Sequence, residues 1–232
     1  MEVEGAVTER TQTRAAEGLP AETRPETSVI YRRFGKRALD LAIGTSLLLL
    51  TAPVLIVLAI VVVATSGWPP LYSSRRLGRH GHEFQMWKLR TMRRDADKIL
   101  PEWLKQNPNL ADEFARGFKL KDDPRITLVG RFLRRSSLDE VPQLWNVIRG
   151  DMSLVGPRPI ILDELSNYGS HGAELLAVRP GITGEWQVTG RNEIEYPERI
   201  AVELASTRKS SLAHDVLILL RTLAAPLRFN GL

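Results

Sequence analysis

Two adjacent acids, Asp139 and Glu140, are the residues of this chain with the clearest potential for chemistry. They lie between arginines and the start of a predicted helix. If Pro142 takes the first position of that helix, where its missing N–H costs nothing, both acids lie within the positive field of a helix N-terminus. Such a place keeps a carboxylate ionised and attracts phosphate. An ionised carboxylate near arginines and a diphosphate can act as a nucleophile or bind a hard cation such as Mg²⁺.

The same acids also have a structural interpretation. The run from Ser137 to Glu140 fits a capping box, in which Glu140 only closes a helix end. That interpretation puts Pro142 at the fifth helical position, where the helix would lose a backbone hydrogen bond. Spacing alone leaves both interpretations open.

Basic residues accompany the acids. Arg134 and Arg135 precede them, Arg158 follows, and a further cluster spans residues 88–91. A guanidinium suits phosphate oxygens, but arginines in such runs are also commonly solvated or ion-paired, and both roles stay open here. His80 and His82 flank a glycine without a third ligand spaced nearby, so the sequence favours a surface turn there over a metal site.

The elements that must position these residues are mostly helical. Apolar spacing predicts helices over 95–119 and 138–148, the second ending at Gly150, and further helix from Pro197 onward. Residues 84–89 predict a short strand. We therefore expect an α+β fold that is predominantly helical with a small β element.

An apolar run without charge, residues 41–65, is interrupted by Pro53. About 25 residues at a rise of ~1.5 Å could cross the ~30 Å hydrocarbon core of a bilayer. Pro53 removes a backbone hydrogen bond and should kink or break the helix. Basic residues flank both ends of the run and favour the cytoplasmic side. A single crossing and a re-entrant helix are both open on these grounds, and membrane lipid is a partner in either case.

Composition supports one membrane anchor and one domain within 232 residues. Residues 1–28, with six glutamates and three arginines and no apolar periodicity, predict a disordered tail. Residues 29–67 then form the membrane helix and 68–232 the globular domain. The net charge of +5 suits anionic lipid, phosphorylated substrates or nucleic acid. Because the chain has no cysteine, a cysteine nucleophile and a disulfide framework are excluded.

Six short motifs follow one another along the chain. They are Arg37-Ala38-Leu39-Asp40, Lys88-Leu89-Arg90-Thr91-Met92, Asp123-Pro124-Arg125, Ser137-Leu138-Asp139-Glu140-Val141-Pro142-Gln143, Gly156-Pro157-Arg158-Pro159 and Arg179-Pro180-Gly181-Ile182-Thr183-Gly184. Their order resembles that of bacterial sugar transferases of the monotopic phosphoglycosyl transferase type, over about residues 30–225.

The resemblance implies transfer of a sugar 1-phosphate from a UDP-sugar to undecaprenyl phosphate, with release of UMP. It makes Asp139 the nucleophile, which holds the sugar phosphate covalently, and Glu140 the ligand of Mg²⁺. Because a covalent intermediate divides the reaction into two stages, each with one substrate, ping-pong kinetics are expected. The remaining positions expected near phosphate or nucleotide are Arg134, Arg158, Lys88, Arg90, Arg191 and Asn192.

The resemblance also favours the re-entrant form of the membrane helix, broken at Thr51 and Pro53. It implies a catalytic domain with membrane-interface helices at the cytoplasmic face of the bacterial inner membrane, in a minimal form with an added tail. A homo-oligomer is compatible with it, and nucleic acid is not an expected partner. Residues 196–211 depart from the family pattern, which leaves the sugar open.

Two rival functions remain. A membrane-anchored basic binding protein would explain the charge and the apolar run, but not the ordered acid motif. A phosphohydrolase would use the same aspartyl phosphate with water as the acceptor, and added polyprenyl phosphate would then divert no product to lipid.

Overall fold

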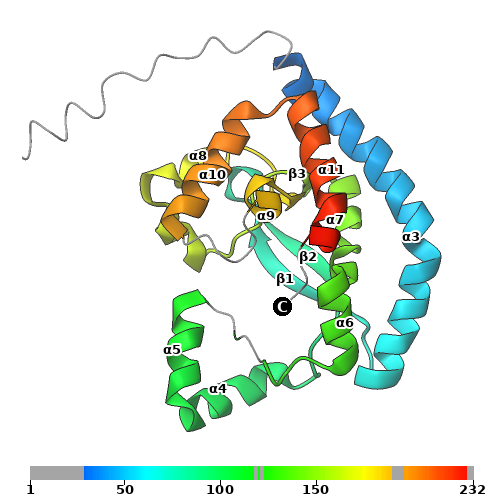
Figure 1. Ribbon diagram of the computed structural model, residues 1–232, viewed down its shortest axis with the longest axis vertical. Coiled ribbons are helices and arrows are strands. Elements are labelled where there is room, and N and C mark those ends of the chain that lie inside the picture. Colours follow the sequence, from blue (N-terminus) through cyan, green and yellow to red (C-terminus); the bar gives the residue numbers. More distant parts are fainter. Residues whose placement is uncertain (1–28, 118–119, 121–122, 190–195, 229–232) are drawn as a thin grey trace, which may run out of the picture.

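The computed structural model describes residues 29–117, 120, 123–189 and 196–228. The predicted tail, residues 1–28, lies outside them. Within the described residues the chain is mostly helical, and its strands form two sheets of two strands each. The α+β expectation is therefore confirmed. Figure 1 shows the long N-terminal helix bowed along one side of a body built around the short strands.

The apolar run forms α3 (Lys36–Ser66), which follows a π-helical turn, η1 (Tyr31–Gly35). Together they are long and apolar enough to cross a membrane. The backbone stays helical through Pro53, so the expected break is not seen; the helix instead curves around the body (Figure 1). The Thr51 hydroxyl donates to the Leu47 carbonyl at 2.7 Å, a bond that tends to bend helices. The helix ends at Gly67, whose φ of 78° suits glycine.

Polar contacts fix the first half of α3 to the body. Arg37 donates to the Val147 and Ile148 carbonyls in the last turn of α7 (Gln143–Arg149), at 2.6 and 2.7 Å, where a cation offsets the negative helix end. Buried Asp40 accepts from the Leu154 amide at 2.9 Å and the Ser153 hydroxyl at 3.0 Å. These bonds explain why a basic and an acidic residue precede the apolar run.

The second half of α3 packs on the same body through apolar side chains. Val62 is buried in a cluster with Leu89 and Leu133. On the outer side, Leu50 is 75% and Ile60 63% exposed. The helix therefore has one edge that packs on the body along its length, through Leu48 and Leu55 as well as Val62, and an exposed apolar face beside that edge.

The predicted strand is confirmed as β2 (Glu83–Leu89), which pairs antiparallel with β1 (Leu71–Leu77). The turn between them contains η2 (Arg79–Gly81), with His80 at φ 59°, so these histidines do form a turn. A second pair, β3 (Ser153–Val155) and β4 (Gly181–Thr183), is parallel.

The main core lies between α7, β2, β3 and a C-terminal helix. It contains Met86, Leu144, Val147, Met152 and Ile218, all nearly inaccessible to solvent. This core holds the segment around the two acids against the sheet.

The predicted helix over 95–119 is wrong in its continuity. The structure has two helices, α4 (Ala96–Gln106) and α5 (Pro108–Gly117), and α4 continues through Pro101. The helix is interrupted at Asn107, whose backbone (φ −134°, ψ 83°) is outside the helical region that a following proline disfavours. Both helices extend away from the body (Figure 1).

The C-terminal part is helical, as predicted. After η4 (Asp163–His171), α8 (Gly172–Leu175) and α9 (Glu185–Thr189), the chain forms α10 (Tyr196–Lys209) and α11 (Leu212–Arg228). One side of α11 packs into the core through Ile218, which is 1% exposed. Its other side exposes Leu217, Leu220 and Leu223, which adds to the apolar surface.

Candidate active site

The acid pair lies in a tight turn between two helices. α6 (Leu128–Ser136) begins at Thr127, whose hydroxyl accepts from the Gly130 amide at 2.9 Å. The helix ends at Ser137, which has a left-handed φ of 56° and redirects the chain into η3 (Leu138–Glu140). α7 begins at Gln143 with Pro142 as its N-cap. The acids thus lie just before a helix start, as predicted. Pro142, expected at the first helical position, is instead the residue before it.

The Asp139 carboxyl is buried, with 6% of the residue exposed. Burial, and after it the neighbouring Glu140 carboxylate, raises the pKa of Asp139 from 3.8 to about 6. Lys88 and Arg134 act in the opposite direction. An aspartate in this place is ionised at neutral pH yet poorly solvated, and both properties suit a nucleophile.

Glu140 pairs with a lysine from the hairpin. The Lys88 ammonium donates to Oε1 of Glu140 at 2.6 Å, and both side chains are about one-third exposed. No side-chain cap forms at Ser137, so the capping-box interpretation is wrong. Lys88 therefore places a positive charge beside both acids.

Arg134 is held close to the acids by Thr91, the residue that follows the end of β2 by two positions. The Arg134 Nε donates to the Thr91 hydroxyl at 3.0 Å, and the Arg134 charge acts on Asp139. A side chain at Gly130 would overlap the Thr91 backbone, so glycine permits this close approach of α6. Thr91 belongs to the second of the six motifs, but nothing in its spacing predicts this contact.

The third motif forms a small clamp beside α6. Arg125 donates through Nε and Nη2 to the two carboxylate oxygens of Asp123, at 2.8 and 2.6 Å. Burial opposes ionisation, but this two-bond pair lowers the pKa of Asp123 overall. The clamp holds the turn that leads into the N-terminus of α6.

Asn146 in α7 supports the strand that carries Lys88. Its amide donates to the Gln85 carbonyl at 2.8 Å, and its oxygen accepts from the Trp87 amide at 3.1 Å. At 1% exposure it is almost completely buried. A polar residue on the buried face of a predicted helix is the signal that could have identified it.

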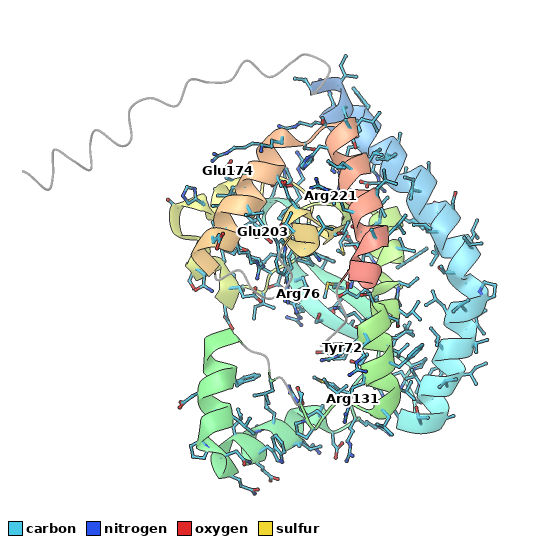
Figure 2. All side chains as sticks on the ribbon, viewed as in Figure 1. Tyr72, Arg76, Arg131, Glu174, Glu203 and Arg221 are labelled. Carbon is cyan, nitrogen blue, oxygen red and sulfur yellow. The ribbon has the colours of Figure 1, made fainter. Side chains whose placement is uncertain are left out.

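Not every predicted residue lies with the acids in the described contacts. The Arg90 guanidinium reaches the Gly67 carbonyl at 3.4 Å, at the end of the membrane helix. The Arg158 backbone amide donates to Glu203 at 3.2 Å, and Figure 2 places Glu203 at the α10 end of the molecule. Arg191 and Asn192 lie outside the described residues. Lys88 and Arg134 are thus the two predicted basic residues that the described contacts bring to the acids.

The acids are compatible with a bound Mg²⁺. The described residues contain no group of three or more acidic or histidine ligands. Mg²⁺ commonly uses one or two protein carboxylates, with water and substrate phosphate completing its shell. Glu140, about one-third exposed and bonded to Lys88 through one oxygen, fits such a site.

A buried aspartate beside a glutamate–lysine pair, in a body fixed to an apolar helix, defines a membrane-associated protein with a candidate catalytic carboxylate. Residues 31–228 match the model of the family described as bacterial sugar transferase. The chain belongs to this family.

Several relatives with assigned names are similar to the chain. An undecaprenyl-phosphate galactose phosphotransferase of Salmonella typhimurium is 43% identical, over 86% of this chain and 42% of its own length. The exopolysaccharide production protein ExoY of Rhizobium meliloti is 40% identical, over 87% of this chain and 90% of its own. The chain thus spans less than half of the first relative and most of the second.

A more distant relative has a name that states its donor. The UDP-glucose:undecaprenyl-phosphate glucose-1-phosphate transferase of Escherichia coli is 36% identical, over 82% of this chain and 39% of its own length.

Proposed function

We propose that this protein transfers a sugar 1-phosphate from a UDP-sugar to undecaprenyl phosphate and releases UMP. The observation that carries the proposal is the buried Asp139 beside the Glu140–Lys88 pair, in a family whose members are named for this transfer. Such a reaction would begin the assembly of an exopolysaccharide or a related glycan, as the name of the ExoY relative suggests.

In the first stage, an Asp139 carboxylate oxygen forms a bond to the β-phosphorus of the UDP-sugar. The bond from this phosphorus to the bridging oxygen breaks, and UMP leaves with that electron pair. Lys88 and Arg134, whose charges act on Asp139, would offset the charge around the reacting phosphorus. When bound at Glu140, Mg²⁺ would stabilise the charge on the diphosphate and on the leaving UMP.

In the second stage, a phosphate oxygen of undecaprenyl phosphate attacks the phosphorus held on Asp139. The bond to the carboxylate breaks, so the free carboxylate is restored and an undecaprenyl diphosphate sugar is released. The covalent intermediate lets two bulky substrates use one site in turn. The raised pKa of Asp139 reflects limited hydration, which also disfavours competing attack by water.

We propose that α3 is re-entrant and that the body lies at the cytoplasmic face of the bacterial inner membrane. Asp40 and Val62 contact the same body, and the 22 positions from one to the other correspond to about 33 Å of helix, more than a bilayer core. A helix that crossed the bilayer over this stretch would separate these contacts by a membrane. The bowed course of α3 supports a helix that returns instead (Figure 1).

The experiment is UMP release by the full chain from a panel of UDP-sugars with Mg²⁺, with and without undecaprenyl phosphate. We expect carrier-dependent UMP release with one donor, loss of release in Asp139→Asn, and normal release in Asp163→Asn, a control on the exposed side of η4. Carrier-independent release with free sugar phosphate would instead indicate a phosphohydrolase. If folded protein released no UMP from any donor of the panel, the proposal would be overturned.

A further inference from the structure

A groove of about 650 Å³ lies where the C-terminal end of α3 meets the first turn of α6. Its lining includes three exposed arginines, Arg93, Arg94 and Arg131, and no acidic residue among the described residues that form it. Among the described residues these three arginines have no ion pair or side-chain hydrogen bond. Three positive charges therefore face one groove without a neutralising partner.

The groove lies beside the C-terminal end of α3, where the apolar membrane helix ends. Ile60, two turns before the end of α3, is 63% exposed, and Trp68 just beyond that end is 70% exposed. Tryptophan is enriched where hydrocarbon meets headgroups. Leu128, 80% exposed, forms part of the groove wall beside the arginines. Figure 2 shows Arg131 at the end of α6 that lies next to the end of α3.

We propose that this groove binds the phosphodiester headgroup of an anionic phospholipid. A guanidinium donates paired hydrogen bonds to phosphate oxygens, and clusters of basic residues beside a membrane segment attract anionic lipids. Exposed Leu128, in the groove wall, offers an apolar contact to the acyl chains of such a lipid. The lipid would fix the end of α3 at the membrane surface.

This site is separate from the acid pair. Lys88, Arg134 and Asp139 do not line the groove. Thr91 lies between the two places, because Arg134 contacts its hydroxyl while Thr127, in the groove wall, donates to its carbonyl at 3.4 Å. A phosphate in the groove is thus a bound lipid and not a reacting group, so the inference does not depend on the proposed reaction.

The test compares lipid binding by two variants of the full chain in detergent. In the groove variant, Arg93, Arg94 and Arg131 are each replaced by Gln. In the control variant, Arg75, Arg149 and Lys209, exposed residues outside the groove, are replaced in the same way, which removes equal charge. Native mass spectrometry and melting temperature are measured with phosphatidylglycerol, with phosphatidylcholine and with undecaprenyl phosphate.

We expect phosphatidylglycerol to bind and stabilise the unmodified protein and the control equally. The groove variant should bind it at least tenfold more weakly, because one arginine near a lipid surface contributes roughly a fivefold change in affinity. The proteins should not differ in their binding of phosphatidylcholine. An unchanged melting temperature of the groove variant in phosphatidylcholine would show that this variant is folded. Arg131→Lys keeps the charge but loses the paired hydrogen bonds, so its affinity should lie between those of the unmodified protein and the groove variant.

Equal weakening in both variants would overturn the site, since net charge alone would then explain binding. Unchanged binding in the groove variant would also overturn it. A loss confined to undecaprenyl phosphate, with phosphatidylglycerol unaffected, would assign the groove to the carrier and overturn the phospholipid assignment. UMP release in detergent should be unchanged in the groove variant, so failure of this site and failure of the proposed reaction are separable.

Discussion

Asp139→Asn should make this protein more stable at neutral pH while removing its activity. The carboxyl is buried and its pKa is raised from 3.8 to about 6, so ionising it in the folded state is unfavourable. A shift of about two pKa units corresponds to about 3 kcal/mol. The amide has no charge to desolvate, and this value is therefore the largest gain that the substitution can give.

The pH dependence of this gain has a definite sign. Between about pH 4 and pH 6 folded Asp139 binds more protons than the unfolded chain does, so the stability of the unmodified protein falls as pH rises through this window. Below about pH 4 the carboxyl is neutral in both states and the advantage of the variant disappears. Above about pH 6 the advantage is complete, and for a chain of this size it equals roughly 6–12 °C in melting temperature.

The assay is unfolding of the full chain in detergent, by heat and by denaturant, from pH 4 to 8 with a chelator present. The chelator is needed because a bound cation would stabilise the carboxylate. Asp163→Asn, at an exposed position, should show no comparable gain. If Asp139→Asn were as stable as the unmodified protein at every pH, Asp139 would not be ionised in an unfavourable place and the reasoning would be refuted.

Three other predictions test the surroundings of the acids and the anchor. Lys88→Gln should reduce UMP release and move the acidic limb of the pH–activity profile upward, because Lys88 lowers the pKa of Asp139; an unmoved limb would argue against this. Asp40→Ala should lower the free energy of unfolding by about 2 kcal/mol, measured by denaturation, since it leaves buried donors of β3 unpaired; an unchanged value would contradict this. Arg33→Cys and Ser74→Cys should both resist an external thiol reagent in intact cells, whereas labelling of one would establish a crossing helix.

Local signals in the sequence were sufficient for many elements. The strand-like run at β2, the glycines that end α3 and α7, and the acids before a helix start all depend on neighbouring residues. The missed break at Asn107 also had a local signal, because Pro108 disfavours a helical residue before it.

The contacts that build the site could not be derived in this way. Lys88 and Glu140 are 52 residues apart, and the bond of Asp40 to the Leu154 amide spans 114 residues. Sequence spacing does not specify the partner of Lys88 or of Asp40, because tertiary packing brings the elements together. Spacing therefore left the capping-box interpretation open. Two features of the structure exclude it, because Glu140 bonds to Lys88 and the Ser137 side chain forms no cap.

The membrane helix and the candidate nucleophile form one structural unit. α3 contacts both α6 and α7, the helices on either side of the turn that carries Asp139. Arg37 binds the end of α7, while Val62 packs on Leu133 of α6. The position of the acids relative to the bilayer is consequently set by packing and not by a loose tether. In a reaction whose acceptor phosphate lies at the headgroups, a shift in α3 would then alter the reach of Asp139 even though the acids stay intact.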